Sequence, residues 1–245
     1  MIEMLGVGVR DGAGGWRLRG VSSRLEPRQL VAVVSGRVEE SRALLECVAG
    51  CRVPEEGRVW VNGVPVMPAT ARRVRAITAT VRWGWPAGDR RPLVRHVLGG
   101  LPGVSAWLAW LPAPPAAVRE AARSALDAVG LRGRDHVRAA GLDAPDLARL
   151  ALARALVRRP RCLVVPELDQ ALARVEAETM LGLLRALSRS AGLTVLAGLR
   201  RLPLAASWAD HLLVIAGGRL AFDGSPRTSG LERSFGRLDA LRAGA

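Results

Sequence analysis

The amino-acid sequence predicts an α/β fold built on a mostly parallel β-sheet. Short, wholly apolar runs are typical of strands buried on both faces, and stretches with helical spacing of apolar residues alternate with them. The predicted buried strands are residues 30–34, 162–165 and 194–199. The predicted amphipathic helices are residues 118–129, 146–158 and 175–187. Buried strands that alternate with helices form parallel sheets flanked by helices.

The remaining elements extend this pattern towards both ends of the chain. Residues 1–9 alternate loosely and predict an edge strand, and residues 57–61 predict a strand closed by an Asn-Gly turn signal. After the first buried strand, we expect a polar loop over residues 35–40 that leads into a helix. Residues 212–222 predict a hairpin.

One stretch interrupts the α/β pattern. Residues from about 85 to 145 are rich in helical signals and poor in strand signals, which indicates an inserted lobe. We therefore expect a single domain over residues 1–245. Its core would be residues 1–84 and 160–245, and a helical subdomain would span about 85–159.

Composition and charge narrow the possible functions. The chain has 245 residues, 49% of them apolar, which excludes global disorder. All 36 basic residues are Arg, and with 22 acidic residues the formal net charge is +14. The arginines are scattered, and there is no Tyr and only two Phe, so the sequence predicts neither a basic block nor a base-stacking surface. Nucleic-acid binding is therefore disfavoured.

The cysteines and apolar stretches bear on the compartment. Three irregularly spaced cysteines predict no disulfide framework and no zinc site, and we interpret Cys47 and Cys51 as buried thiols in a reducing compartment. The N-terminus has no signal-peptide pattern. The uncharged stretch 97–118 is interrupted by Gly and Pro, so it reads poorly as a spanning helix. We expect a soluble protein without a metal site.

The order of the segments resembles one family. The strand–loop–helix unit is followed by the Asn-Gly hairpin and the helical insert, and then by Ala-Arg-Ala-Leu at 153–156. The apolar strand with Glu167 comes next, and the chain closes with Trp-Ala-Asp-His at 208–211 and the hairpin. Over nearly its whole length the chain resembles the ATP-binding subunits of ABC transporters. Within that family, residues 95–101 are similar to the phosphonate importer ATPases.

The resemblance implies a fold, cofactors and partners. The fold would be a RecA-like P-loop NTPase core with a mostly parallel sheet, an N-terminal antiparallel β part and an inserted helical subdomain. The cofactors would be ATP and Mg²⁺, held between two such subunits as a homodimer or a heterodimer with another ATP-binding subunit. The pair would drive a transmembrane permease, so the chain would be cytoplasmic and peripheral at the inner face of the membrane.

The phosphate-binding loop of this family is altered here. Such a loop needs glycines that let backbone N–H groups approach the phosphates, a Lys, and a hydroxyl that holds magnesium. The matching stretch 35–43 reads Ser-Gly-Arg-Val-Glu-Glu-Ser-Arg-Ala. Ser35 replaces the first required glycine and Glu40 replaces the last, and Ser41 and Arg42 stand where the Lys and the magnesium-binding hydroxyl are expected. Gly36, Ser41 and Arg42 are the candidate cofactor-binding residues.

Most other functional positions of the family are also replaced. Glu167 matches the catalytic Glu that polarises the attacking water, and it is the one candidate catalytic residue. The replaced positions are the magnesium-organising Asp (Pro166), the Q-loop (Trp83), the signature segment (142–146), the D-loop Asp (Ala173) and the γ-phosphate-sensing His (Arg200). No aromatic residue stands at the adenine-stacking place near Gly12, although Trp16 is close.

Tryptophans gather in the insert and just before it. Trp83, Trp85, Trp107 and Trp110 are candidate partner-binding residues, because exposed tryptophans in an apolar stretch are good interface anchors and the family's helical lobe docks the permease. Alternatively, these side chains fill the core of the lobe itself.

Three hypotheses follow from these residues. The first is a degenerate ABC subunit with weak or no ATP hydrolysis that serves a phosphonate or small-anion importer. The second is a pseudo-ATPase scaffold that binds a permease or partner ATPase without nucleotide. The third is an Arg-rich nucleic-acid-binding protein that reuses the fold.

Overall fold

The computed structural model describes residues 1–84, 89–101 and 114–228, which form two compact units. The larger unit contains residues 1–78 together with those from 161 onward, and the helical unit contains residues 79–160. Among the described residues, no helix combines the length and the apolar character needed to cross a bilayer.

A six-stranded, mostly parallel sheet forms the centre of the fold, with strand order β10-β9-β3-β8-β7-β6. Its strands are β3 (Leu30–Ser35), β6 (Thr78–Thr80), β7 (Cys162–Val165), β8 (Thr194–Leu199), β9 (His211–Ala216) and β10 (Arg219–Gly224). Strand β3 pairs in parallel with both β8 and β9, and β7 pairs in parallel with β8. Every residue of β3, β7 and β8 is buried, which confirms the prediction of strands covered on both faces.

A second, antiparallel sheet of the larger unit has the order β2-β1-β4-β5. Its strands are β1 (Ile2–Arg10), β2 (Trp16–Leu25), β4 (Glu56–Val61) and β5 (Val64–Pro65). The prediction of an edge strand at residues 1–9 is wrong, because β1 lies between β2 and β4. Gly6 has a φ of +59°, and the register shifts between Met4 and Val7, so the loose alternation marks a bulge in an inner strand.

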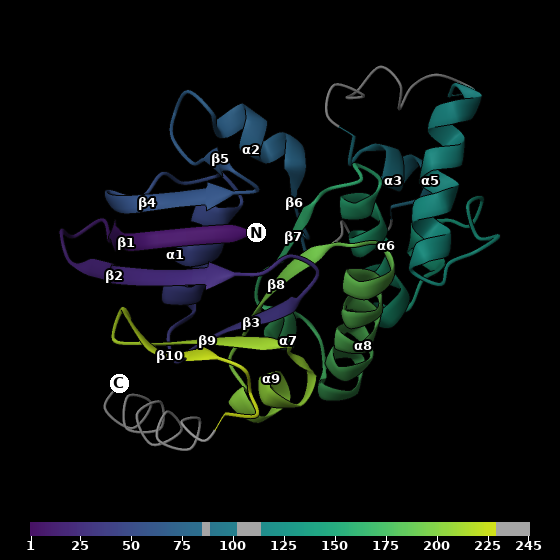
Figure 1. The fold of residues 1–245 in the computed structure, drawn as a ribbon. Helices are drawn as coiled ribbons and strands as arrows, with labels where there is room; N and C mark the ends of the chain where they lie inside the picture. The colour runs from purple at the N-terminus through teal and green to yellow at the C-terminus, as the bar shows by residue number, and fades with distance from the viewer. Residues whose placement is uncertain (85–88, 102–113, 229–245) are drawn as a thin grey trace. The chain divides into compact units, whose positions relative to one another are not determined.

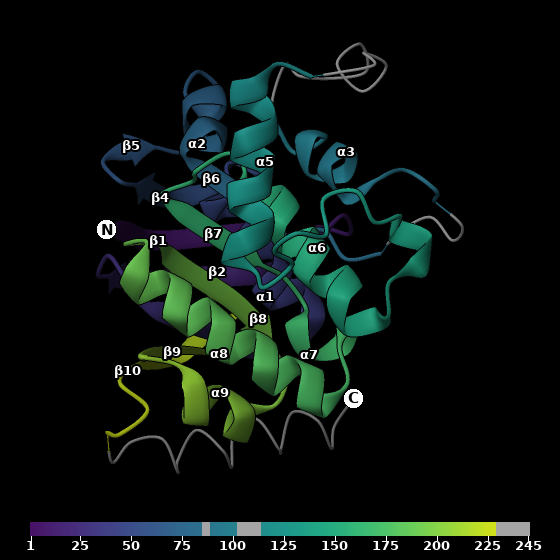
Figure 2. The same cartoon turned by 90° about the vertical axis from the view of Figure 1, so that its right-hand side faces the viewer.

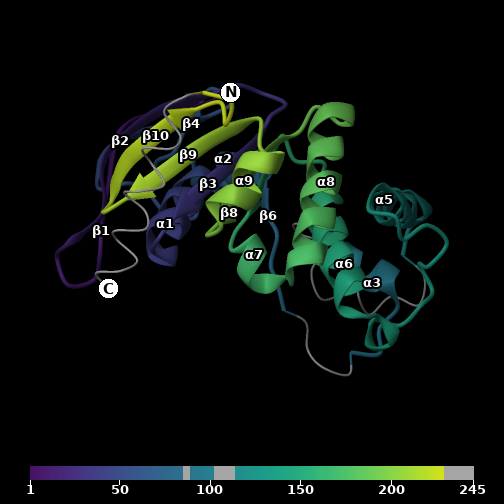
Figure 3. The same ribbon diagram turned by 90° about the horizontal axis from the view of Figure 1, so that it is seen from below.

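Helices of the larger unit cover both faces of the parallel sheet. These helices are α1 (Val38–Val48), α7 (Leu168–Ala171), α8 (Arg174–Ser190) and α9 (Leu202–Trp208), whereas α2 (Ala71–Ile77) contacts β5 of the antiparallel sheet. Helix α1 lies between the two sheets, and its apolar face joins residues of both in one core (Figure 3). On the opposite face, α8 and α9 lie side by side against the parallel sheet (Figure 2).

In the described part of the helical unit, three α-helices pack against one another (Figure 1). They are α3 (Leu93–Leu98), α5 (Ala116–Ala128) and α6 (Ala144–Leu156), with a short 3₁₀ helix, Ala139–Gly141, directly before α6. Helix α5 ends just before Gly130, as its apolar spacing predicts.

Candidate functional site

The stretch that matches the phosphate loop is largely helical. Helix α1 begins at Val38, so the prediction of a polar loop over residues 35–40 is wrong beyond Arg37. Glu39 and Glu40 lie in the first turn of α1, where carboxylates interact favourably with the positive end of the helix dipole. The acids that replace the loop residues thus allow the helix to start early.

Glu40 is a buried carboxylate at the position of the last required glycine. Its side chain is directed inward, and the residue is only 4% exposed. The Ser35 hydroxyl donates to Glu40 Oε2 at 2.5 Å, and the backbone N–H of Gly218 donates to Glu40 Oε1 at 2.9 Å. Both carboxylate oxygens are therefore satisfied by the protein itself, as a buried charged group requires.

Gly218 belongs to the tight turn between β9 and β10 and joins three segments. Its N–H bonds Glu40 of α1, and its carbonyl accepts from the backbone N–H of Arg19 in β2 at 2.8 Å. Its φ is +74°, and a Cβ there would lie 2.8 Å from the Arg17 carbonyl oxygen. Only glycine fits this position, so the turn that delivers the N–H to Glu40 depends on it.

Ser41 and Gly36 do not form a phosphate cradle. Ser41 is 7% exposed, and its hydroxyl donates to the Val38 carbonyl at 3.1 Å within the same helix. Gly36 has no positive φ, and a Cβ on it would meet nothing within 4 Å. The conformation at Gly36 therefore does not require a glycine.

Arg42 and Glu167 pair with each other. Arg42 Nε donates to Glu167 Oε1 at 2.7 Å, and Arg42 Nη2 contacts the same oxygen. This hydrogen bond raises the pKa of the Arg42 guanidinium. Glu167, in the left-handed region at φ 52°, directly precedes α7. The structure thus brings two of the predicted site residues together, but as an ion pair that occupies both.

Asp169 is a buried carboxylate with several hydrogen bonds, and the sequence did not indicate a role for it. Its side chain is 1% exposed, and its oxygens accept the backbone N–H groups of Arg200 at 3.0 Å and of Arg201 at 2.8 Å. It therefore anchors the start of α9 at the position where the family has its phosphate-sensing His. No local pattern around Asp169 predicts these partners, which lie 31 and 32 residues further along the chain.

The signature stretch of the helical unit caps its own helix. The Asp143 side chain accepts from the Asp146 backbone N–H at 2.9 Å, and Pro145 lies in the first turn of α6. The Asp146 carboxylate pairs with Arg134 and, at 3.1 Å, with Arg149. The N-terminus of α6 is therefore capped and charge-paired within the unit.

Trp16 near the expected adenine place is covered by arginine. The Arg10 guanidinium lies 4.3 Å from the Trp16 ring centroid, and that of Arg19 lies 6.0 Å away. These are cation–π distances. One face of the Trp16 ring is thus already in contact with a side chain.

The predicted partner-binding tryptophans are mostly outside the described residues. Trp85, Trp107 and Trp110 lie there, and Trp83 is half-buried in the helical unit. Among the cysteines, Cys47 and Cys162 are buried, and burial raises the pKa of each thiol to about 12. The prediction that Cys51 is buried is wrong, since it lies just beyond α1 and is exposed.

The residues present do not fit Mg-ATP. A phosphate nest needs convergent backbone N–H groups, but from Val38 onward this stretch is helix with a buried carboxylate inside it. Pro166 stands where the family has the Asp that organises magnesium, so this carboxylate is missing. Glu167 is paired with Arg42. Within residues 1–84, 89–101 and 114–228, no three His, Cys, Asp or Glu side chains gather as a metal site.

Comparisons with known proteins identify phosphonate import ATP-binding proteins among the relatives of this chain. No protein-family model matches the chain. The phosphonates import ATP-binding protein PhnC 2 of Rhodopseudomonas palustris is 32% identical over 226 residues, which cover 91% of this chain and 79% of the relative. The protein of the same name from a Synechococcus species is 26% identical over 230 residues, 92% of this chain and 86% of the relative.

Solved structures agree with the predicted fold. An ATP-binding cassette of an ABC transporter in its ADP conformation matches with a TM-score of 0.84 and 18% identity, over 100% of this chain and 99% of the other. CbiO1 of Clostridium perfringens, part of an ABC transporter complex, matches with a TM-score of 0.80 and 18% identity, over 98% and 94%. These matches confirm the RecA-like P-loop fold. Together with the 32% identical relative, they establish that the chain belongs to the ATP-binding subunits of ABC transporters, of the phosphonate importer type.

Proposed function

We propose that this chain is a degenerate subunit of a phosphonate-type ABC importer, retained as a structural partner with weak or no ATP hydrolysis. The observation that carries the proposal is the Glu40 carboxylate, which is buried in the former phosphate loop and bonded by Ser35 and Gly218. Two like unit charges 4 Å apart repel by about 4 kcal/mol at an effective dielectric of 20. Millimolar ATP binding is worth only about 4 kcal/mol, so this repulsion is enough to abolish it.

The family membership supports the partners of this proposal. The subunit would pair with a copy of itself or with a competent ATP-binding subunit, and it would contact a transmembrane permease from the cytoplasmic side. The helical unit would be the inserted subdomain that docks the permease, with Trp83, Trp85, Trp107 and Trp110 as anchors. If these rings instead fill the core of the helical unit, the permease would dock on a different surface of that unit.

A calorimetric titration of the purified chain with Mg-ATP tests the proposal. We expect no saturable binding to the native protein. The variant Glu40→Gly, Ser41→Lys removes the buried carboxylate and restores a cation at the Lys position, so it is expected to gain measurable affinity. The matched control Glu39→Gly removes an exposed carboxylate from the same helical turn and should gain nothing.

Rapid ATP hydrolysis by the native chain would contradict the proposal. The measurement is phosphate release by the purified chain, compared with that of Glu167→Gln, because only Glu167 matches the family's catalytic position. Release that Glu167→Gln abolishes would show that the site turns over ATP on its own. Release that persists unchanged in Glu167→Gln would come from a contaminating enzyme and leaves the native chain inactive, as proposed.

A further inference from the structure

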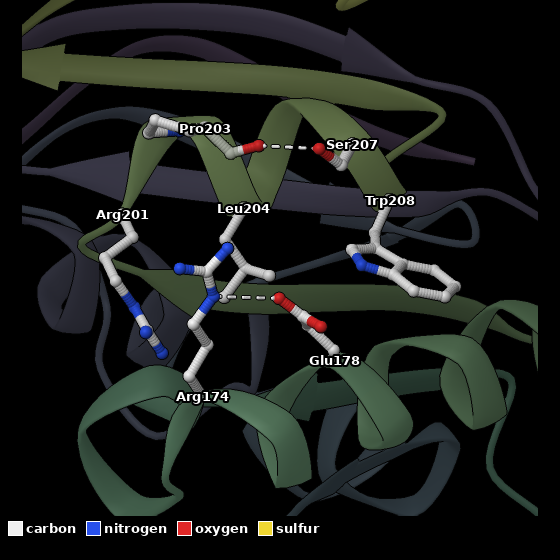
Figure 4. A pocket seen from close by; sticks show the side chains of 7 residues that line it. All are labelled: Arg174, Glu178, Arg201, Pro203, Leu204, Ser207 and Trp208. Atoms are coloured by element: carbon white, nitrogen blue, oxygen red, sulfur yellow. Dashed lines mark hydrogen bonds and ion pairs between the residues drawn. The ribbon is translucent and has the colours of Figure 1, made fainter.

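Two hollows beside α9 in the larger unit differ in how their arginines are paired. The first, of about 300 Å³, lies between α8 and α9 and is drawn in Figure 4. There Arg174 Nε donates to Glu178 Oε1 at 3.1 Å, and Arg201 Nε donates to Asp169 Oδ2 at 3.3 Å. Each guanidinium of the first hollow therefore has a carboxylate of its own.

The second hollow collects three guanidinium groups around one carboxylate. It has a volume of about 350 Å³ and lies where α8, the end of α9 and the segment after β10 meet. Its polar lining consists of Arg185, Arg189, Ser207, Asp210, Ser225 and Arg227. We call it the Arg185–Arg227 pocket.

The single carboxylate of this pocket is already shared. Asp210 Oδ2 accepts from the backbone N–H of Leu30 at 3.0 Å. Asp210 Oδ1 lies 3.4 Å from Nη2 of both Arg185 and Arg189, which is beyond the usual hydrogen-bond range for such groups. One carboxylate at these distances satisfies neither guanidinium.

The arginines keep unused donors. The Nε of Arg185 is buried and has no hydrogen-bond partner among the described residues, although its side chain is 30% exposed towards the hollow. Arg227 forms no ion pair within the described part of the chain. Among the described residues, Ser225 Oγ accepts from the Arg227 backbone N–H at 3.4 Å and donates to no acceptor, so its hydroxyl hydrogen remains for another one. These donors approach one space from α8 and from the segment after β10.

We propose that the Arg185–Arg227 pocket binds a phosphoryl group, carried by a small soluble anion or by a lipid headgroup. A tetrahedral dianion offers acceptor oxygens in several directions, which suits guanidinium forks that come from different elements. A planar carboxylate cannot use donors on all sides in this way. The pocket contains no residue of the former phosphate loop, so this site is independent of the proposed function.

Titration calorimetry with inorganic phosphate at low ionic strength tests the pocket. We expect saturable binding that weakens about tenfold or more in Arg185→Gln, Arg227→Gln, because charge-assisted hydrogen bonds are lost. The control Arg72→Gln, Arg73→Gln removes two exposed charges on α2 and should leave the affinity within about twofold. Arg227→Gln alone has no ion pair to break, and it should weaken binding without lowering the unfolding temperature.

Asp210→Asn should raise the affinity for phosphate, whereas the arginine substitutions should lower it. Its amide oxygen still accepts from Leu30, but the competing negative charge is gone, so phosphate should bind several-fold more tightly. A merely structural role for this cluster predicts no such gain. Three results would each overturn the proposal. The first is that the native chain binds neither phosphate nor vesicles. The second is that the α2 control weakens binding as much as Arg185→Gln, Arg227→Gln does, and the third is that Asp210→Asn binds phosphate more weakly.

Vesicle co-sedimentation separates the two sources of the phosphoryl group. Vesicles of phosphatidylcholine are compared with vesicles that also contain phosphatidylglycerol, with the native chain and Arg185→Gln, Arg227→Gln. Binding that requires both phosphatidylglycerol and the two arginines would assign a lipid headgroup. Arginine-dependent binding of free phosphate alone would assign a soluble anion. Vesicle binding that the two substitutions leave unchanged would contradict the lipid assignment.

Discussion

The phosphate-loop stretch and the signature stretch both carry acids where the family has glycines or small polar residues, but the fold accommodates these acids differently. Glu40 is buried and bonded by two neutral donors, a hydroxyl and a backbone N–H. Asp146 lies at the start of α6 and is held by the guanidinium groups of Arg134 and Arg149. Both residues are buried, so each carboxylate needs partners: two neutral donors placed by the fold satisfy Glu40, whereas two opposite charges balance Asp146. The phosphate loop is therefore the more deeply remodelled of the two.

Replacement of Glu40 is the strongest test of this contrast. Glu40→Ala leaves the Ser35 hydroxyl and the Gly218 N–H without their acceptor, and we expect the free energy of unfolding to fall by about 2–4 kcal/mol. The exposed neighbour Glu39→Ala should cost less than about 1 kcal/mol. Urea unfolding measures both variants. Equal losses would mean that burial does not distinguish these two carboxylates.

Acidification is expected to weaken the support of the signature stretch. The guanidinium of Arg91 lowers the pKa of the Asp89 carboxyl to about 2. The backbone carbonyls of Asp89 and Arg91 accept from Ala140 and Ala139, directly before α6. Because the pKa is lower in the folded state, the pair stabilises the fold above about pH 4, and this contribution is lost as the pH falls towards about 2.

The size of this acid effect is about 2 kcal/mol. Urea unfolding and hydrogen exchange at residues 139–141, measured across that pH range, would follow it. Asp89→Asn should remove this part of the pH dependence. An unchanged pH profile in the variant would show that other carboxyls dominate.

Asp146→Ala should have a smaller effect that depends on salt. It removes two ion pairs whose guanidinium groups are partly exposed, and we expect a loss of about 1–2 kcal/mol at low ionic strength. High salt should reduce this loss by screening, while the loss from Glu40→Ala should persist because its partners are neutral. Asp127→Ala, which breaks an exposed pair with Arg132, is the control and should cost less than about 0.5 kcal/mol. Equal salt dependence of the Asp146 and Glu40 variants would remove the contrast.

Arg42→Ala should have the smallest effect on stability. Arg42 is 48% exposed and Glu167 is 28% exposed, so water screens their pair and its loss should cost less than about 1 kcal/mol. The variant should also bind Mg-ATP no better than the native chain, because Glu40 remains in place. A gain of affinity in Arg42→Ala would place the obstacle to nucleotide in this pair instead.

Much of the fold could be predicted from residue patterns. The wholly apolar runs of β3, β7 and β8 need no partner to be recognised, because burial on both faces leaves no polar position in the strand. Strand β2, over Trp16–Leu25, escaped prediction because Gly20 has a positive φ and breaks the two-residue alternation. The inner position of β1 was also not predicted, because β1 is an inner strand only through its pairing with β2.

Less of the site could be predicted, because its contacts cross long stretches of chain. The sequence placed Glu40 at the position of the last required glycine, but its bond to Gly218 spans 178 residues. The sequence separately identified Arg42 and Glu167 as candidates, and their pairing spans 125 residues. The residues next to each partner in the sequence do not indicate the other partner. The sequence patterns therefore predicted a role for each residue but not the pairing.

The sequence by itself determined which chemical groups this protein has kept and lost, and its strand and helix periods determined the α/β class. Those properties are local, because they depend on residue type and on spacing within a few turns or pleats. The tertiary structure alone decided that Glu40 is buried, that Arg42 and Glu167 are paired, and that Arg185 and Arg189 share Asp210. Burial and charge pairing depend on groups that chain folding brings together from distant positions, and they set the free energy of each acid and each cation.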